Sequence, residues 1–165
     1  MTDNKTLDIL KNAILLEKRG KAFYRKAADQ SKNADVKAFF ETMAAEEVQH
    51  VKILSDQFKA FSQSGKFNPP DTSHTGTVSK NVLTAEVKGR IDAADFEAAA
   101  ISAAMLMEER AISLYAKRSN EAKDPEEKKL YQWLADWEKE HLEFLAAIDS
   151  EVKEQIWNDT GFWPF

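Results

Sequence analysis

The chain has 165 residues, 43% of them hydrophobic, which is enough for a single domain with one sizeable core. Its formal net charge of −5 argues against nucleic acid as a partner. The absence of cysteine excludes disulfides, thiol redox chemistry and iron–sulfur or rubredoxin-type centres, so any metal must be held by oxygen and nitrogen ligands.

No segment of the sequence has the character of a membrane anchor or a leader. Residues 1–19 carry Asp3 and Asp8 and contain no apolar run of signal-peptide length. The most apolar window, Ala98–Met107, is about half as long as a membrane-spanning helix must be. We therefore expect a cytoplasmic protein without a membrane partner.

Four stretches have apolar residues at the three-to-four spacing of amphipathic helices. The first covers Leu7–Gln30. The second covers Ala34–Phe61 and follows Asn33, a favourable N-cap. The third covers Ala93–Asn120. The fourth begins after Asp124, where an N-cap, a proline and acidic residues follow one another.

The connections between these stretches predict the topology. The first and third connections are short, so each pair of helices should form an antiparallel hairpin. The middle connection, Ser62–Ile91, is rich in glycine, proline and polar residues, with one short helix predicted near Thr84–Lys88. Two hairpins and one long crossover predict an all-α, ferritin-like four-helix bundle over residues 1–165.

An internal repeat relates the two hairpins. A shift of 91 residues aligns them without a gap and preserves the polar residues on the apolar faces. The pairs are Glu17 with Glu108, Tyr24 with Tyr115, Glu47 with Glu138, and His50 with His141. Within each Glu-x-x-His motif both side chains point the same way, because residues three apart share a helix face.

These repeated residues predict a metal centre. Four carboxylates on the inner faces, with no Lys or Arg among them, cannot neutralise one another, and buried charges in proteins are paired or bind metal. Two divalent cations would satisfy them. A single Glu-x-x-His motif arises easily by chance, but two matched motifs with matched upstream glutamates do not. The predicted ligands are Glu17, Glu47, His50, Glu108, Glu138 and His141.

Other polar and aromatic residues receive plainer interpretations. Tyr24 and Tyr115 are expected to be core aromatics whose hydroxyls could donate to the ligating carboxylates. His74, in the polar connection, is not expected to bind metal. Glu46, Glu109 and Glu140 are expected to be solvated. Glu97 is expected near a bundle end, outside the site. Trp133 and Trp137 are expected to serve in packing or in an interface.

With these motifs, the chain resembles the rubrerythrin branch of the ferritin-like superfamily over nearly its whole length. The resemblance implies Glu17 and Glu108 as terminal carboxylates, with Glu47 and Glu138 bridging two irons. Rubrerythrins typically have a further ligating Glu where this chain has Ala111, so its donor set is more symmetric. Their rubredoxin domain requires cysteines, which implies an external electron donor protein here.

The resemblance also implies a function. We expect a non-haem di-iron oxidoreductase that reduces peroxide, or dioxygen, in defence against oxidants. Ferroxidation with iron storage or delivery is one alternative, and a dimanganese, catalase-like site is another, because the ligand set does not choose between iron, manganese and zinc. A purely structural bundle is the remaining possibility.

The end of the chain is unusually aromatic. Residues 156–165 include Trp157, Phe162, Trp163 and Phe165, more apolar surface than a free tail normally exposes. We expect this tail to dock on its own bundle or on a neighbouring subunit, and the protein to form a homodimer or a higher oligomer.

Overall fold

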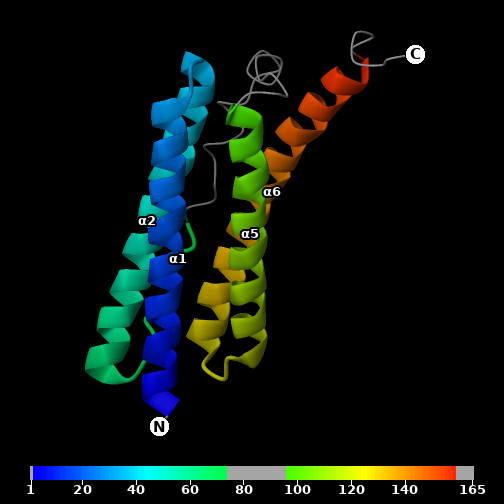
Figure 1. Ribbon diagram of the computed structural model, residues 1–165. Coiled ribbons are helices and arrows are strands. Elements are labelled where there is room, and N and C mark those ends of the chain that lie inside the picture. Colours follow the sequence, from blue (N-terminus) through cyan, green and yellow to red (C-terminus); the bar gives the residue numbers. More distant parts are fainter. Residues whose placement is uncertain (1, 74–95, 159–165) are drawn as a thin grey trace.

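The computed structural model describes residues 2–73 and 96–158, and over these ranges the chain forms helices and no strand (Figure 1). The helices are α1, Thr2–Gln30; α2, Ala34–Ser64; α5, Phe96–Glu121; and α6, Pro125–Asn158. The predicted short helix near Thr84–Lys88, His74 and residues 159–165 lie outside the described ranges. None of the described helices is both long enough and apolar enough to cross a membrane.

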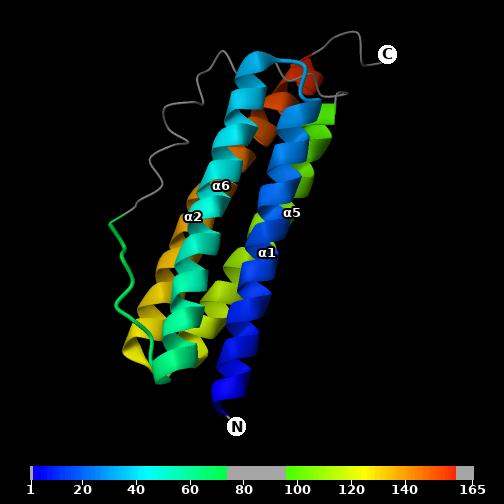
Figure 2. The same ribbon diagram turned by 90° about the vertical axis from the view of Figure 1, so that its left-hand side faces the viewer.

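The helices pack as the predicted ferritin-like bundle. α1 packs along α2, and α5 packs along α6, as two antiparallel hairpins. Figures 1 and 2 show that α1 and α6 run in one direction while α2 and α5 run in the other. The end of α2 and the start of α5 therefore lie at opposite ends of the bundle, as in a ferritin-like fold with one crossover.

Capping residues set several of the helix ends. Asn33 Oδ1 accepts from the backbone N–H of Asp35 at 2.9 Å and begins α2. Asp124 Oδ1 accepts from Glu126 N–H at 2.8 Å and begins α6. Gly65 ends α2 at φ 68°, a left-handed conformation that suits glycine, and its N–H bonds to the carbonyl of Phe61 at 2.8 Å. This cap carries α2 three residues beyond its predicted end.

The start of α1 differs more from the prediction. The helix begins at Thr2, five residues before the predicted Leu7. Residues 2–6 show no apolar stripe, and periodicity therefore could not reveal them. Thr6 is nevertheless buried, and Arg118 Nη2 donates to its hydroxyl at 3.4 Å while Arg118 Nε bonds Glu127 at 2.8 Å. These polar contacts with α5 and α6 hold the first turns of α1 on the bundle.

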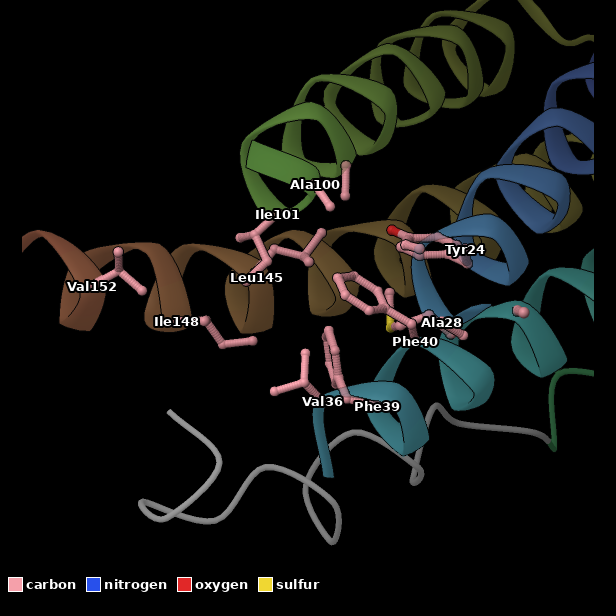
Figure 3. Packing of buried hydrophobic residues seen from close by; sticks show 14 residues of the cluster. Tyr24, Ala28, Val36, Phe39, Phe40, Ala100, Ile101, Leu145, Ile148 and Val152 are labelled. Carbon is pink, nitrogen blue, oxygen red and sulfur yellow. The ribbon is translucent and has the colours of Figure 1, made fainter. Parts of the chain in front are cut away.

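The buried apolar side chains form two clusters that are separated along every helix. One cluster contains Tyr24, Phe39, Phe40, Ile101 and Leu145, together with smaller residues (Figure 3). The other is built around Leu10, Leu54, Tyr115, Leu130, Tyr131 and Leu134. On each helix the predicted metal ligands fall between the two clusters, so a polar layer lies across the middle of the bundle with apolar packing on both sides.

Candidate metal centre

All six predicted ligands point into the layer between the two apolar clusters. Each has at most 3% of its surface exposed. They form two overlapping groups whose possible ligand atoms lie within 4.8 Å of one another. Glu47 and Glu138 belong to both groups, Glu17 and His50 to one, and Glu108 and His141 to the other. The arrangement offers one carboxylate and one imidazole to each of two positions, with two carboxylates between them.

Glu138 lies between the two imidazoles. Its Oε1 is 2.9 Å from Nδ1 of His50, and its Oε2 is 3.0 Å from Nδ1 of His141. Nδ1 of His50 is also 3.3 Å from Glu17 Oε2. The Nδ1 atoms, rather than the Nε2 atoms, therefore face the carboxylates of the other predicted ligands. One oxygen of Glu138 is directed to each half of the centre, as a bridging ligand requires.

Several buried atoms in this layer make no hydrogen bond of good geometry among the described residues. Four of them face the other predicted ligands: Oε2 of Glu47, both carboxylate oxygens of Glu138 and Nδ1 of His141. The Glu138 oxygens approach the Nδ1 atoms of the two histidines as ion-pair contacts only. Oε1 of Glu46 and Nε2 of His50 also lack a hydrogen bond. A buried polar atom without a partner costs about 1–3 kcal/mol. Divalent cations would satisfy the four atoms that face the other ligands, and carboxylate and imidazole ligands suit iron, manganese and zinc. These residues therefore fit a pair of metal ions.

The pKa values describe how the layer behaves without cations. Burial, reinforced by the carboxylate of Glu138, raises the pKa of Glu17 and of Glu108 well above the ordinary value. Burial alone would lower the pKa of His50 and of His141. The carboxylates that face them have the larger effect, so the pKa of both imidazoles is raised. Burial also opposes ionisation of Glu138, yet those imidazoles lower its pKa. Protons on these groups thus balance the carboxylate charge, and metal ions would displace them.

Two tyrosines cross the bundle to reach the outer carboxylates. Tyr115 on α5 donates its hydroxyl to Glu17 on α1, and Tyr24 on α1 donates to Glu108 on α5. Burial, together with the Glu108 carboxylate, raises the pKa of Tyr24 and keeps it protonated as a donor. The sequence predicted core aromatics whose hydroxyls could donate to the ligating carboxylates, and the structure shows that each donates to the carboxylate of the other hairpin.

A cavity of about 220 Å³ opens between α1 and α5 onto the carboxylate side of the centre. Its lining consists largely of pairs related by the 91-residue repeat: Leu16 and Met107, Glu17 and Glu108, Arg19 and Arg110, Gly20 and Ala111, with Glu47 completing it. Gly20 and Ala111 leave the space open. Ala111 is the position noted above as departing from the typical rubrerythrin pattern, and its small side chain contributes to this opening.

The expectation for Glu46 was wrong, because this residue is buried rather than solvated. It is 3% exposed, and its Oε2 contacts Nε2 of His141 and accepts from Trp137 Nε1 at 2.9 Å. Periodicity misplaced Glu46 because it lies one residue before the ligand Glu47. The internal repeat could have indicated this burial. Glu46 aligns with Trp137, and tryptophan side chains are highly buried on average.

The other residues near the ligands mostly lie where they were expected. Glu109 is exposed, whereas Glu140 is half-buried. Glu97 is buried near the bundle end, outside the centre, and accepts from the backbone N–H of Lys32 at 3.0 Å. Trp133 and Trp137 pack edge to face, with their ring centroids 4.9 Å apart. Trp137 also contacts the imidazole of His50.

The fold and the clustered Glu and His side chains define a ferritin-like, four-helix carboxylate protein. The family model described as Rubrerythrin matches residues 8–149, and the chain belongs to this family. Family membership supports a di-iron carboxylate protein, and the buried clusters are suited to hold the metal. No curated protein and no solved structure matches the chain.

Proposed function

We propose that this protein is a di-iron oxidoreductase that reduces hydrogen peroxide with electrons from an external donor protein. The observation that carries the proposal is the cavity of about 220 Å³ that reaches the carboxylates Glu17, Glu47 and Glu108 between α1 and α5. It offers a route for a molecule of a few atoms to the buried centre. When bound, two Fe(II) ions supply two electrons to one such molecule.

The residues around the centre support this chemistry in three ways. Glu47 and Glu138 lie between the two halves and could hold both ions together. Tyr24 and Tyr115 orient the outer carboxylates through their hydroxyls. The apolar clusters pack on either side of the layer, and the cavity between α1 and α5 offers the layer a route to solvent.

The ligand chemistry of these 165 residues supports an external electron donor. Reduction of one peroxide to two waters takes two electrons and two protons, and the 165 residues contain no cysteine for a sulfur-ligated electron-transfer centre. We propose that a separate redox protein returns the electrons after each turnover. Iron is the proposed metal by family membership, with manganese and zinc compatible with the same ligands.

The test is anaerobic loading with Fe(II), followed by mixing with hydrogen peroxide or with dioxygen in separate stopped-flow experiments. We expect one peroxide to be consumed for each pair of irons, faster than dioxygen, with repeated turnover when a reductant is supplied. Glu138→Ala should abolish this reaction. Glu109→Ala, an exposed change on α5, should leave it intact and serves as the matched control.

Two results would overturn peroxide reduction. Faster oxidation by dioxygen, with continued uptake of iron beyond the pair, would identify ferroxidation and iron storage. Activity only with manganese, with release of dioxygen from peroxide, would identify a catalase-like reaction.

A further inference from the structure

The six ligands obey the internal repeat, but the residues immediately behind the two histidines do not. Position 46 on α2 aligns with position 137 on α6, and these positions hold Glu46 and Trp137. Both side chains are buried, with exposures of 3% and 6%. The predicted ligands are therefore identical in the two hairpins, but the residues that lie behind the two histidines are not.

The histidine of α6 has a carboxylate behind it. Nδ1 of His141 faces the centre, 3.0 Å from Glu138 Oε2, and Nε2 on the opposite side of the ring contacts Oε2 of Glu46. Trp137 Nε1 donates to the same oxygen at 2.9 Å and fixes its place. The imidazole is thus held from both sides.

The histidine of α2 has an aromatic ring in the corresponding place. Nδ1 of His50 faces the centre at 2.9 Å from Glu138 Oε1, but its buried Nε2 makes no hydrogen bond among the described residues. The indole of Trp137 packs against this imidazole, with ring centroids 4.3 Å apart and planes at 83°. Packing restrains His50, but no acceptor orients its outer N–H.

This difference has a chemical consequence for the ligands. An imidazole that binds metal through Nδ1 carries its proton on Nε2, and a carboxylate that accepts this proton fixes the tautomer, fixes the ring plane and makes Nδ1 a stronger donor. We propose that Glu46 is a positioning residue for His141 and makes the two metal positions unequal, with the ion beside His141 bound more tightly than the ion beside His50. The inference rests on the proposed metal centre but not on its reaction with peroxide.

Glu46 acts through His141 rather than as a ligand itself. The two groups of side chains whose atoms converge within 4.8 Å do not include it. Its bound oxygen, Oε2, is shared by His141 and Trp137, both of which lie on α6. Removing the carboxylate should therefore change one metal position and leave the other as it was.

The test is titration of the metal-free protein with Co(II), followed by its visible absorption bands and by competition with a chelator. The native chain should bind two ions in two unequal steps. His141→Ala should remove the tighter step, whereas His50→Ala should retain it. Glu46→Ala should weaken the tighter step by about 10–100-fold, the usual cost of losing such a partner, without changing the weaker step.

Two further variants separate positioning from simple packing. Glu46→Gln keeps the shape and an acceptor oxygen, and should recover part of the lost affinity. Trp137→Phe keeps a ring beside His50 but removes the N–H donated to Glu46, and should change the tighter step only a few-fold. If Glu46→Ala does not fold, Glu46→Gln still tests the proposal, with an intermediate loss confined to the tighter step.

Equal steps in the native chain, or a Glu46 substitution that weakens both steps alike or neither, would overturn the inference. Failure of the native chain to bind Co(II) at all would overturn the metal centre itself. The two failures are therefore distinguishable.

Discussion

The Tyr115 hydroxyl on α5 donates to the carboxylate of Glu17 on α1, across 98 residues of sequence. Its repeat counterpart makes the reverse connection, from Tyr24 on α1 to Glu108 on α5. The two hairpins are thereby linked at the level of the candidate metal centre, and each outer carboxylate is held by the hairpin that does not carry it. Orientation of these carboxylates is consequently a property of the assembled bundle.

The tyrosine links can be tested by removing one hydroxyl. Tyr115→Phe should destabilise the protein by about 1–2 kcal/mol, as expected for loss of a buried hydrogen bond, and should weaken metal binding by about tenfold or more. Tyr131→Phe is the matched control, because the Tyr131 ring stacks on Tyr115 while its buried hydroxyl makes no hydrogen bond among the described residues. Urea unfolding and metal titration would measure both. Equal losses in the two variants would contradict the role given to the link.

The bridging position of Glu138 predicts an all-or-none effect. Because its two oxygens face the two histidines at 2.9 and 3.0 Å, Glu138→Ala should abolish binding of the metal pair, as should Glu47→Ala. His50→Ala should weaken mainly one ion. Metal content after Fe(II) loading and desalting provides the measurement. Retention of two ions by Glu138→Ala would exclude its proposed bridging role.

Substitution of Gly20 should weaken metal binding with little change in the stability of the metal-free protein. A Cβ at this position would lie 3.2 Å from Cδ of Glu47, so Gly20→Ala should displace this carboxylate and weaken metal binding. In the metal-free protein, the gain in helix propensity of about 1 kcal/mol should offset much of the crowding. Ala111→Gly, at the repeat-related position, is the control: it should cost stability without crowding a ligand. Thermal unfolding and metal titration separate the two effects, and unchanged affinity in Gly20→Ala would contradict this prediction.

The metal-free protein should lose stability as pH rises from about 5 to 8, a window that reaches above the ordinary pKa values of Glu and His. Glu17, Glu108, His50 and His141 have raised folded-state pKa values, so each binds more protons when folded than when unfolded. Their contribution is fully present below the unfolded pKa values, about 4.5 for Glu and 6.5 for His, and is lost as pH rises through the folded values. Glu138, whose pKa is lowered, acts in the opposite direction, but only in more acidic solution.

Metal should remove most of this pH dependence, because bound cations favour the ionised carboxylates and stabilise only the folded state. Thermal unfolding of metal-free and metal-loaded protein across this range is the measurement. If both forms unfold alike at every pH, and Glu47→Ala changes neither curve, the six residues do not form a metal site.

The sequence by itself determined the helices of the described residues, their two hairpins and the six inward-facing candidate ligands. Each of these depends on spacing along a single helix: apolar residues every three to four positions, Glu and His three apart, and caps such as Asn33 and Asp124. The 91-residue repeat then related one hairpin to the other without any knowledge of their packing. The family match over residues 8–149 agrees with that fold.

Only the tertiary structure decided what surrounds the ligands. Helical periodicity gives the direction of a side chain about its own axis, but not which neighbouring helix covers it. Glu46 appeared solvated by that criterion and is instead enclosed by His141 and Trp137 on α6. The crossed tyrosines and the opening beside Gly20 depend in the same way on the approach of α1 and α5. Contacts between helices arise from packing in three dimensions. The internal repeat places equivalent candidate ligands in the two hairpins, but it could not reveal that the residues around them differ.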